Sequence, residues 1–385
     1  MKIVADANII DVQTLYETHG ELHLLPGREI RPEDVRDAQV LIVRSITKVN
    51  EKLLGHSDVE LVLSATSGTD HIDLDYLAHR GIHFEDAAGS NANAVVEYCL
   101  SAMAELRLSR QFDWTNKRVG IIGYGNVGSR LYRVLSAMGV ECVACDPFVE
   151  SKTALDEAGG RPQFCSFEQA LSCDVVSLHT PLSTTGEYPT HYMINDNTLK
   201  LLKPDALLMN ASRGAVVDNE ALFQHLKSQP HMLSVLDVWE NEPLILGRLL
   251  DIVTIATPHI AGYSVEAKKK ASAMNYESFK RFYGLLDEEP GAVAANTLRA
   301  IDCAALLDTG DSVYQQLAKV LRATFSITDV DRQLRECGAS NGAGFDAIRK
   351  AMADRREFSH VQLGNSAMLR PETREILTNL DFALA

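Results

Sequence analysis

The sequence predicts an α/β protein built of two doubly wound domains with a cleft between them, followed by a small α+β domain. Short apolar runs alternate with helical patterns along most of the chain, and a glycine-rich turn joins a strand to a helix near its middle. About the last hundred residues lose this regular alternation. A chain of 385 residues is long enough for two or three domains with separate cores.

The glycine-rich turn is the most informative part of the chain. Val119–Ile122 is a short apolar run suited to a buried parallel strand, and Gly123, Gly125 and Gly128 follow as G-x-G-x-x-G before a helical pattern. Such glycines permit a tight turn, close approach of the backbone to a pyrophosphate, and close packing of helix on strand. Asp146 ends the next predicted strand, where a carboxylate accepts both ribose hydroxyls and repels a 2′-phosphate. The unit therefore predicts a Rossmann-type site for NAD rather than NADP.

Further strand-like runs indicate the domain organisation. Four short apolar runs after the fingerprint complete a six-stranded sheet, at residues 174–178, 205–210, 233–238 and 251–257. Three earlier runs predict a smaller, flavodoxin-like domain, at residues 2–6, 39–43 and 60–65. Long helical patterns over 93–110 and 264–284 connect the two. We therefore expect a substrate-binding domain at 1–93 and 270–285, an NAD-binding domain at 94–269 and a third domain at 286–385, with ligands in the cleft at the carboxyl ends of strands.

The composition argues against several classes of partner. Asp and Glu total 52 against 37 Lys and Arg, and the formal charge of −15 disfavours nucleic acid and anionic membranes. No apolar run reaches the roughly 20 residues of a membrane span, and the N-terminus reads as a strand rather than a signal peptide, so a cytoplasmic protein is expected. The seven cysteines are scattered, and Cys142 and Cys145 point to opposite faces of one predicted strand. We therefore expect neither a disulfide framework nor a metal site.

Three side chains with complementary chemistry follow successive predicted strands. Arg213, Glu242 and His259 each lie just beyond one of the last three strands of the nucleotide-binding domain. Oxidation of an alcohol by NAD needs a base for the hydroxyl proton, a cation beside the substrate carboxylate, and a group that tunes the base. Each residue alone has an ordinary interpretation as a solvated or packed loop residue. Their occurrence at three successive strand ends beside a cofactor domain indicates a catalytic site.

At these residues the chain resembles the D-2-hydroxyacid dehydrogenase family, over about residues 40–285. The resemblance is carried by the fingerprint and by the motifs VRSITKVN, SATSGTDHID, HTPLSTTG, NASRGAVVD, DVWENEP and TPHIAGYS. It implies that Arg213 binds the substrate carboxylate and carbonyl, that Glu242 hydrogen-bonds the histidine, and that His259 transfers the proton. It also implies cofactor contacts at Asn126, Val127, Thr180, Ala211, Ser212, Asp237 and Gly262.

Two polar loops of the N-terminal domain predict a second anion on the substrate. Arg44, Ser45 and Lys48 follow one predicted strand, and Thr66 and Gly68 follow the next. Cations, hydroxyls and backbone N–H groups in adjacent loops are suited to a phosphate. Ordinary turn chemistry with solvated charges is the alternative. The sequence therefore favours a phosphorylated 2-hydroxy acid as the small-molecule substrate.

Within the family, the chain is similar to members that oxidise a 4-phosphorylated four-carbon 2-hydroxy acid on a route to pyridoxal phosphate. The enlarged loop STTGEYPTHYMI and the extension beyond Gly284 contribute to this similarity. It implies substrate contacts at Ser45, Thr66 and Tyr263, although Tyr263 is equally suited to packing. It also implies a homodimer formed through residues 286–385, and packing of this extension on its own subunit is the alternative.

Two other functions stay open on the sequence. A sibling dehydrogenase for 3-phosphoglycerate or another D-2-hydroxy acid would have the same motifs, although the extension does not read as the regular βαββαβ pattern of many regulatory domains. An NADH-sensing interaction protein on the same fold can also retain the Arg, Glu and His. Oxidation of the four-carbon acid but not of 3-phosphoglycerate would distinguish the three.

Overall fold

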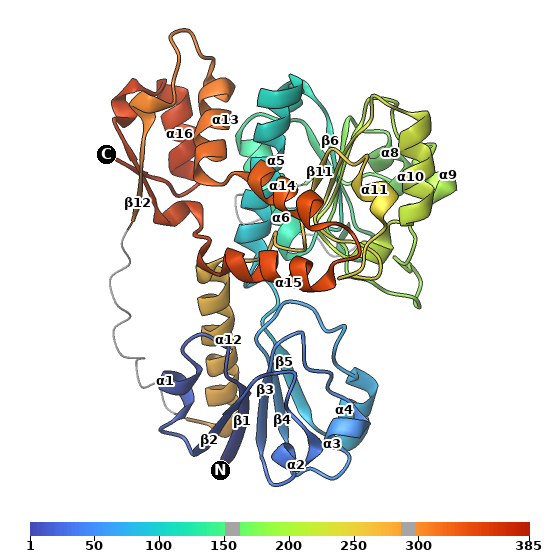
Figure 1. Cartoon of the computed structure of the whole chain (residues 1–385), viewed down its shortest axis with the longest axis vertical. Helices are drawn as coiled ribbons and strands as arrows, with labels where there is room; N and C mark the ends of the chain where they lie inside the picture. The colour runs from blue at the N-terminus through green and yellow to red at the C-terminus, as the bar shows by residue number, and fades with distance from the viewer. Residues whose placement is uncertain (151–161, 286–297) are drawn as a thin grey trace. The chain divides into compact units, whose positions relative to one another are not determined.

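The computed structural model describes residues 1–150, 162–285 and 298–385, and it divides the chain into two compact units (Figure 1). Unit 1 consists of Met1–Asn91 and the segment from Ser264 that contains helix α12 (Val265–Tyr283). Unit 2 consists of Ala92–Tyr263 and the described C-terminal residues. No helix in the described part of the chain combines the length and the apolar composition that crossing a bilayer requires.

Unit 1 is built on a parallel sheet. In spatial order its strands are β2 (Glu21–Leu25), β1 (Lys2–Asp6), β3 (Val40–Val43), β4 (Leu61–Ser64) and β5 (His83–Asp86). The three central strands are the apolar runs that the sequence identifies, and nearly all of their residues are buried. The sequence analysis did not identify β2 and β5, because these edge strands are partly exposed and include polar or charged residues.

Helix α12 covers one face of this sheet, although it lies far along the chain. Successive residues of β3 point to opposite faces, so that Leu41 packs in one core and Ile42 in the other. The core of Ile42 includes Tyr276 and Phe279 of α12, and both rings meet Tyr16 edge to face, with centroids 5.5 and 5.2 Å away. The short helices of the unit are α1 (Val12–Tyr16), α2 (Pro32–Val35), α3 (Glu51–Leu54) and α4 (Leu74–Arg80).

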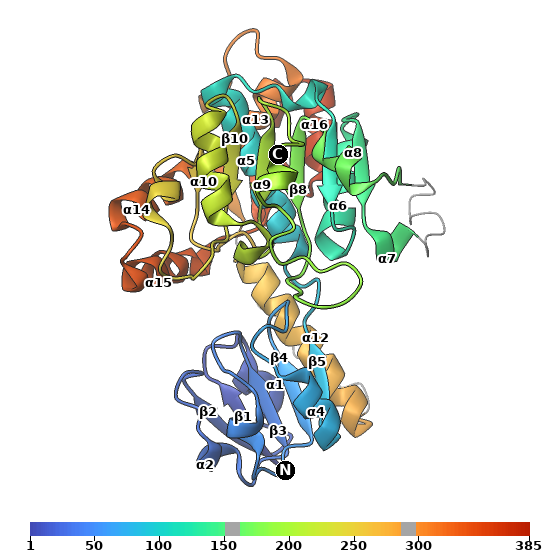
Figure 2. The same ribbon diagram turned by 90° about the vertical axis from the view of Figure 1, so that its right-hand side faces the viewer.

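The nucleotide-type sheet of unit 2 is also parallel (Figure 2). In spatial order its strands are β11 (Ile255–Ala256), β10 (Leu233–Leu236), β9 (Leu207–Asn210), β8 (Val175–Leu178), β6 (Val119–Ile122) and β7 (Cys142–Cys145). An isolated parallel bridge between Ala144 and Phe164 extends the pairing beyond β7. The strand order reverses between β6 and β8, which is where doubly wound sheets bind dinucleotides.

The last predicted strand of this sheet, residues 251–257, is shorter in the structure. Helix α11 (Gly247–Leu250) ends in a turn at Asp251 and Ile252, which are exposed, and only Ile255 and Ala256 extend as β11. The other helices of this region are α5 (Ala92–Arg110), α6 (Asn126–Ala137), α7 (Pro147–Glu150), α8 (Phe167–Leu171), α9 (Asp196–Leu199) and α10 (Asn219–Ser228).

The C-terminal residues form a small α+β region, as the sequence predicts. Its parallel sheet has the order β12 (Arg299–Asp302), β13 (Val361–Gly364) and β14 (Ala383–Leu384). Its helices are α13 (Val313–Thr324), α14 (Ile327–Cys337), α15 (Gly342–Ala351) and α16 (Pro371–Asn379).

This C-terminal region is docked on the nucleotide-type sheet of its own chain. Asp331 of α14 accepts a hydrogen bond of 2.7 Å from the Ala256 N–H, so it satisfies a donor on the edge strand β11. Arg335 donates to the carbonyls of Leu250 and Val253. Tyr314 of α13 donates to the Met138 carbonyl at 2.5 Å. Packing on its own subunit is therefore a property of the extension.

Candidate active site

The glycine-rich turn between β6 and α6 has the shape of a phosphate-binding loop. Gly123 has a φ of +91°, and a Cβ at this position would lie 2.6 Å from the His179 carbonyl oxygen. A Cβ on Gly128 would overlap the Gly123 carbonyl oxygen, whereas a Cβ on Gly125 would meet no atom within 4 Å. The fold therefore requires the first and third glycines, and the second leaves an open approach to the N-terminus of α6, where an anion is stabilised.

Asp146 lies at the end of β7, beside this loop. Its carboxylate accepts hydrogen bonds from the N–H of Tyr124 at 2.9 Å and of Phe148 at 3.1 Å. Tyr124 lies between the first two glycines, so the acid is held next to the turn that would carry the pyrophosphate. This position suits a carboxylate that binds the ribose hydroxyls.

The other predicted cofactor residues also lie at the carboxyl edge of the sheet or in the loops that leave it. They are Asn126 and Val127 at the start of α6, Thr180 after β8, Ala211 and Ser212 after β9, Asp237 after β10, and Gly262 in the turn after β11. Because the strands are parallel, their carboxyl ends meet at one edge. These residues are thus gathered where a dinucleotide would extend across the sheet.

Glu242 and His259 are joined directly. His259 Nδ1 lies 2.7 Å from Glu242 Oε2, and Glu242 Oε1 accepts a hydrogen bond of 2.7 Å from the Trp239 N–H. Both oxygens of the carboxylate are therefore engaged, and Nε2 is the imidazole nitrogen that can meet a substrate. The side chain of His259 is 35% exposed, whereas that of Glu242 is 20% exposed. This geometry suits an accessible proton-transfer histidine that is oriented by a mostly buried carboxylate.

The loop that carries His259 is held by the buried carboxylate of Asp237. One oxygen accepts from the Thr257 hydroxyl at 2.6 Å and the Ile260 N–H at 2.8 Å, and the other accepts from the Ala261 N–H at 2.8 Å. The His259 N–H donates to the Asp237 carbonyl at 2.6 Å. His259 has a φ of +55°, a left-handed conformation that is costly for a non-glycine residue and persists only when the surroundings impose it. Asp237 is therefore a structural anchor of the histidine.

The titrating groups of the site are shifted by burial and by each other. Burial raises the pKa of the Asp237 carboxyl, against the charge of His259 and the hydrogen bonds from its loop. Burial also acts to raise the pKa of Glu242, but the charge and hydrogen bond of His259, the Trp239 N–H and the charge of Arg349 together hold this pKa below its ordinary value. Glu242 is therefore ionised at neutral pH. Burial lowers the pKa of His179 to about 4, so that imidazole is neutral.

Arg213 lies in the loop after β9, and this loop packs against the turn that leads to Glu242. A Cβ on Gly214 would overlap the Trp239 carbonyl, so the two backbones are in contact at this point. Asn210 braces the loop by donating to the Arg213 carbonyl at 3.0 Å and accepting from the Ser212 hydroxyl at 2.8 Å. The side chains of Glu242 and His259 are therefore joined by a hydrogen bond. The loop that carries Arg213 is linked to the Glu242 turn by the backbone contact between Gly214 and Trp239.

The predicted anion loops lie at the carboxyl ends of β3 and β4 in unit 1. Ser45 and Lys48 are exposed, and Gly68 has a φ of +108°. The hydroxyl of Thr66 lies 2.9 Å from the hydroxyl of Ser64, within hydrogen-bonding distance. The Ser64 hydroxyl also lies 3.1 Å from His71 Nε2. These residues are gathered at one edge of the unit 1 sheet.

Arg44 has a partner that sequence analysis did not anticipate. Its Nε donates to the Asp6 carboxylate at 2.7 Å, and its Nη2 donates to the other oxygen at 3.3 Å. Asp6 is fully buried, whereas the arginine is 29% exposed. Much of the charge of Arg44 is therefore used to neutralise Asp6, which is visible in the sequence only as the acid that ends the first strand.

Tyr263 is contacted by a residue of the C-terminal region. Arg349 Nη2 donates to the Tyr263 hydroxyl at 3.3 Å, and the guanidinium lies 5.3 Å from the centre of its ring. Sequence analysis missed Arg349 because it lies in a segment without a motif. Among the described residues, no group of three or more His, Cys, Asp or Glu is arranged to hold a metal ion.

Unit 2 matches two known families of domains. Residues 99–261 match the NAD-binding domain of D-isomer-specific 2-hydroxyacid dehydrogenases, and residues 298–380 match a domain of unknown function. The first match identifies residues 99–261 as an NAD-binding domain. The glycine loop fits this cofactor, because the position of Gly125 is open.

The chain is similar along its whole length to proteins of one name. An erythronate-4-phosphate dehydrogenase of Teredinibacter turnerae is 44% identical over 387 residues, which cover 100% of both chains. Others from Saccharophagus degradans and Cellvibrio japonicus are 43% and 42% identical, and the alignments cover 94% and 99% of each chain.

Solved structures of more distant proteins have the same fold. An NAD⁺-bound 3-phosphoglycerate dehydrogenase of Entamoeba histolytica aligns with a TM-score of 0.62 at 24% identity, covering 74% of this chain and 95% of the other. A D-lactate dehydrogenase of Aquifex aeolicus, complexed with NAD and lactic acid, aligns with a TM-score of 0.59 at 23% identity, covering 74% and 96%.

We expect Gly128→Ala to lower the stability of unit 2 by about 1–3 kcal/mol, because the added methyl overlaps the Gly123 carbonyl oxygen. Gly125→Ala is the matched control. It should change stability by less than about 0.5 kcal/mol but weaken NADH binding, since the methyl projects where the phosphates approach. Urea unfolding and fluorescence titration with NADH measure the two effects. Equal stability of the two variants would contradict the steric assignment.

The lowered pKa of Glu242 predicts a pH-dependent contribution to stability. The contribution is fully present above the pKa of an unfolded glutamate, about 4.3, and is lost as the pH falls through the lower folded value. Glu242→Gln should therefore destabilise the protein by on the order of 1 kcal/mol at neutral pH and by less at about pH 3. Urea unfolding at both pH values tests this, with the exposed Glu375→Gln as control. If Glu242→Gln lost the same stability at both pH values, the charge of Glu242 would not be the cause of the stabilisation.

Proposed function

We propose that this chain, which belongs to the erythronate-4-phosphate dehydrogenase family of the D-isomer-specific 2-hydroxyacid dehydrogenases, oxidises 4-phospho-D-erythronate with NAD. The product is 2-oxo-3-hydroxy-4-phosphobutanoate, an intermediate in the synthesis of pyridoxal 5′-phosphate. The observation that carries the proposal is the Glu242–His259 hydrogen bond near the carboxyl edge of an NAD-binding sheet. It occurs in a chain that aligns over its full length with proteins of that name.

The side chains have distinct tasks in this reaction. Bound NAD supplies the hydride acceptor, and the loop of residues 123–128 together with Asp146 holds it. Arg213 binds the substrate carboxylate and so sets the orientation of C2. His259 takes the proton of the C2 hydroxyl as the hydride leaves C2, and Glu242 stabilises the imidazolium that results. In the reverse direction the imidazolium returns the proton to the carbonyl oxygen.

The loops of unit 1 are assigned to the remainder of the substrate. Ser45 and Thr66 provide hydroxyls, Gly68 provides an accessible backbone, and Lys48 provides an exposed ammonium group, which together suit a phosphorylated ligand. Arg44 contributes through its pair with Asp6, which keeps a buried carboxylate from repelling an anion. In this assignment residues 1–93 and 270–285 bind substrate and residues 94–269 bind NAD.

The cellular location and the assembly belong to the same proposal. Cys99, Cys142, Cys173, Cys303 and Cys337 are free thiols, which agrees with a reducing cytoplasm. The C-terminal region at 286–385 is assigned to a homodimer. Its strand β12 lies at an edge of the small sheet and has three exposed residues out of four, and such an edge can pair or pack with a second copy.

The activity is tested by incubating the purified protein with NAD and 4-phospho-D-erythronate. NADH should appear with this acid and not with 3-phosphoglycerate, and His259→Ala should lower kcat by roughly 10²- to 10⁴-fold. NADH affinity should be nearly unchanged in that variant, because the imidazole acts on the substrate. The exposed His231→Ala serves as control. Absence of NADH with both acids would favour an NADH-sensing protein, and activity on 3-phosphoglycerate alone would favour the sibling dehydrogenase.

Analytical ultracentrifugation of a dilution series tests the assembly. We expect a sedimentation coefficient of a dimer at micromolar protein, since an interface that involves the β12 edge would bury apolar and backbone groups. Addition of NADH should leave the dimer intact. Monomer alone throughout the micromolar range would refute the assigned dimer.

A further inference from the structure

Helix α15 of the C-terminal region is attached to the segment that follows Glu242. The Ile245 N–H donates to the Ala339 carbonyl at 3.0 Å, immediately before the helix begins. A Cβ on Gly342, the first residue of α15, would lie 3.0 Å from Pro243 Cγ. The start of the helix is therefore in close contact with the chain next to the catalytic glutamate.

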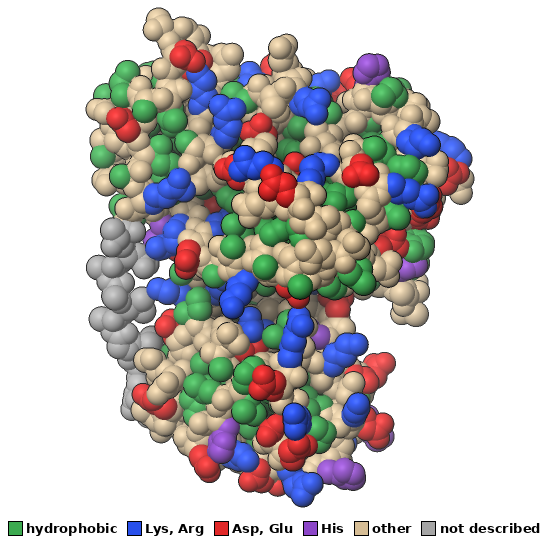
Figure 3. Space-filling view, in the orientation of Figure 1, with side chains coloured by type: hydrophobic (Ala, Val, Ile, Leu, Met, Phe, Trp, Pro, Cys, Tyr) green, Lys and Arg blue, Asp and Glu red, His purple; other side chains and the backbone are tan. Residues whose placement is uncertain are grey.

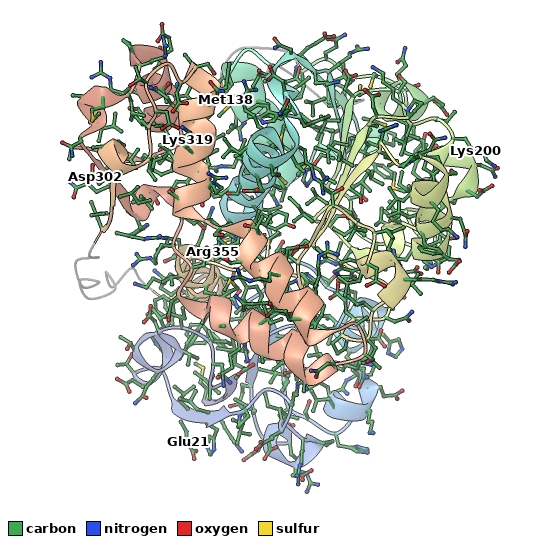
Figure 4. All side chains as sticks on the ribbon, turned by 45° about the horizontal axis from the view of Figure 1, so that its top comes forward. Glu21, Met138, Lys200, Asp302, Lys319 and Arg355 are labelled. Atoms are coloured by element: carbon green, nitrogen blue, oxygen red, sulfur yellow. The ribbon has the colours of Figure 1, made fainter. Side chains whose placement is uncertain are left out.

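The end of this segment is attached to the loop that follows His259. Arg355 (labelled in Figure 4) donates to the carbonyls of Ile260 at 3.2 Å and Ala261 at 3.0 Å. It also donates to the Ala94 carbonyl at 2.9 Å. Helix α15 and the residues after it are thus held at both ends by the two loops that carry the Glu242–His259 pair. A side chain on α15 that faces these loops is therefore held near the Glu242–His259 pair.

Arg349 is such a side chain. Its Nη2 donates to the Tyr263 hydroxyl, its guanidinium lies over the Tyr263 ring, and its Nη1 lies 3.6 Å from Asp346 on the same helix. Its Nε is buried and has no acceptor among the described residues. The side chain as a whole is 22% exposed. A guanidinium has five N–H donors, so Arg349 retains capacity for a further acceptor.

The position of this arginine matches the chemistry of a second anion. Arg349 contacts Tyr263 in the loop that follows His259, and its helix begins against Pro243, so the guanidinium and the Glu242–His259 pair share one neighbourhood; the charge of Arg349 also acts to lower the pKa of Glu242. The phosphate of a 4-phosphorylated acid lies two carbons beyond the reacting C2, so its ligand should be close to His259 without replacing it. Tyr263 follows His259 by four residues and contacts Arg349. Arg213 is assigned to the carboxylate and Lys48 of unit 1 is one exposed cation for the phosphate, so Arg349 is a further cation for a dianionic group that a protein of formal charge −15 otherwise repels.

We infer that Arg349, together with the hydroxyl of Tyr263, binds the phosphate of the substrate and determines specificity for a phosphorylated acid. The inference rests on the proposed function and assigns a substrate-binding role to the C-terminal region. The planar guanidinium can donate two parallel hydrogen bonds to phosphate oxygens, and the phenol can add a third. The competing explanation is that Arg349 only packs on Tyr263.

Kinetics with matched substrates separates the two explanations. Arg349→Met should raise KM for 4-phospho-D-erythronate by roughly 10- to 100-fold, because a charge-assisted hydrogen bond contributes to binding. Its kcat should change by less than about threefold, and kcat/KM for unphosphorylated D-erythronate should stay the same. Arg349→Lys should restore part of the affinity, since it retains the charge without the fork. Lys350→Met removes one charge from an exposed neighbour on α15 and should change nothing.

Titration of inorganic phosphate into the NADH-loaded protein by calorimetry gives a readout independent of turnover. Arg349→Met should weaken phosphate binding about tenfold or more relative to wild type and Lys350→Met. If the wild type binds phosphate through Arg349 but does not oxidise 4-phospho-D-erythronate, the proposed function fails, whereas Arg349 is confirmed as a phosphate-binding residue. The inference is overturned if Arg349→Met and Lys350→Met bind phosphate equally. It is also overturned if Arg349→Met impairs both hydroxy acids alike while melting at the wild-type temperature.

Discussion

The carboxylate of Asp237 organises the loop that carries His259, to which we assign proton transfer. It is buried after β10 and accepts hydrogen bonds from the Thr257 hydroxyl and the Ile260 and Ala261 N–H groups, while its own carbonyl accepts from His259. Without these bonds the left-handed backbone at His259 would be an unfavourable conformation. With them, the imidazole is presented to Glu242 in one orientation. A buried acid, costly in isolation, thus secures the geometry of the Glu242–His259 pair.

Attraction of an anionic substrate to this protein has to come from individual cationic side chains, because the net charge has the wrong sign. Acidic and basic side chains are interspersed on the face shown in Figure 3, and the formal charge of −15 would repel an anionic substrate. In the proposed function, local cations therefore have to bind the substrate. Arg213 and Arg349 of unit 2 are assigned to this task, whereas Arg44 of unit 1 is paired with a buried acid. The inferred role of Arg349 connects the C-terminal region to substrate binding.

The sequence was informative where burial or chemistry leaves a strong local pattern. Strands β3, β4, β8 and β9 are buried on both faces, so they appear as continuous apolar runs. The edge strands β2 and β5 are partly exposed and lack such a run, and β11 is shortened by a preceding helix and turn. Arg213, Glu242 and His259 were found because each follows a recognisable strand.

The sequence by itself determined the NAD fingerprint and the doubly wound fold class, and it predicted the residues of the catalytic set. These features depend on residues that are close together in the sequence. They can therefore be predicted from the steric and hydrogen-bonding rules for strands, turns and helix ends. Only the tertiary structure decided that Asp6 neutralises Arg44 and that Arg349 reaches Tyr263. Contacts between residues far apart in the chain are set by how whole elements pack, and no local pattern records that packing.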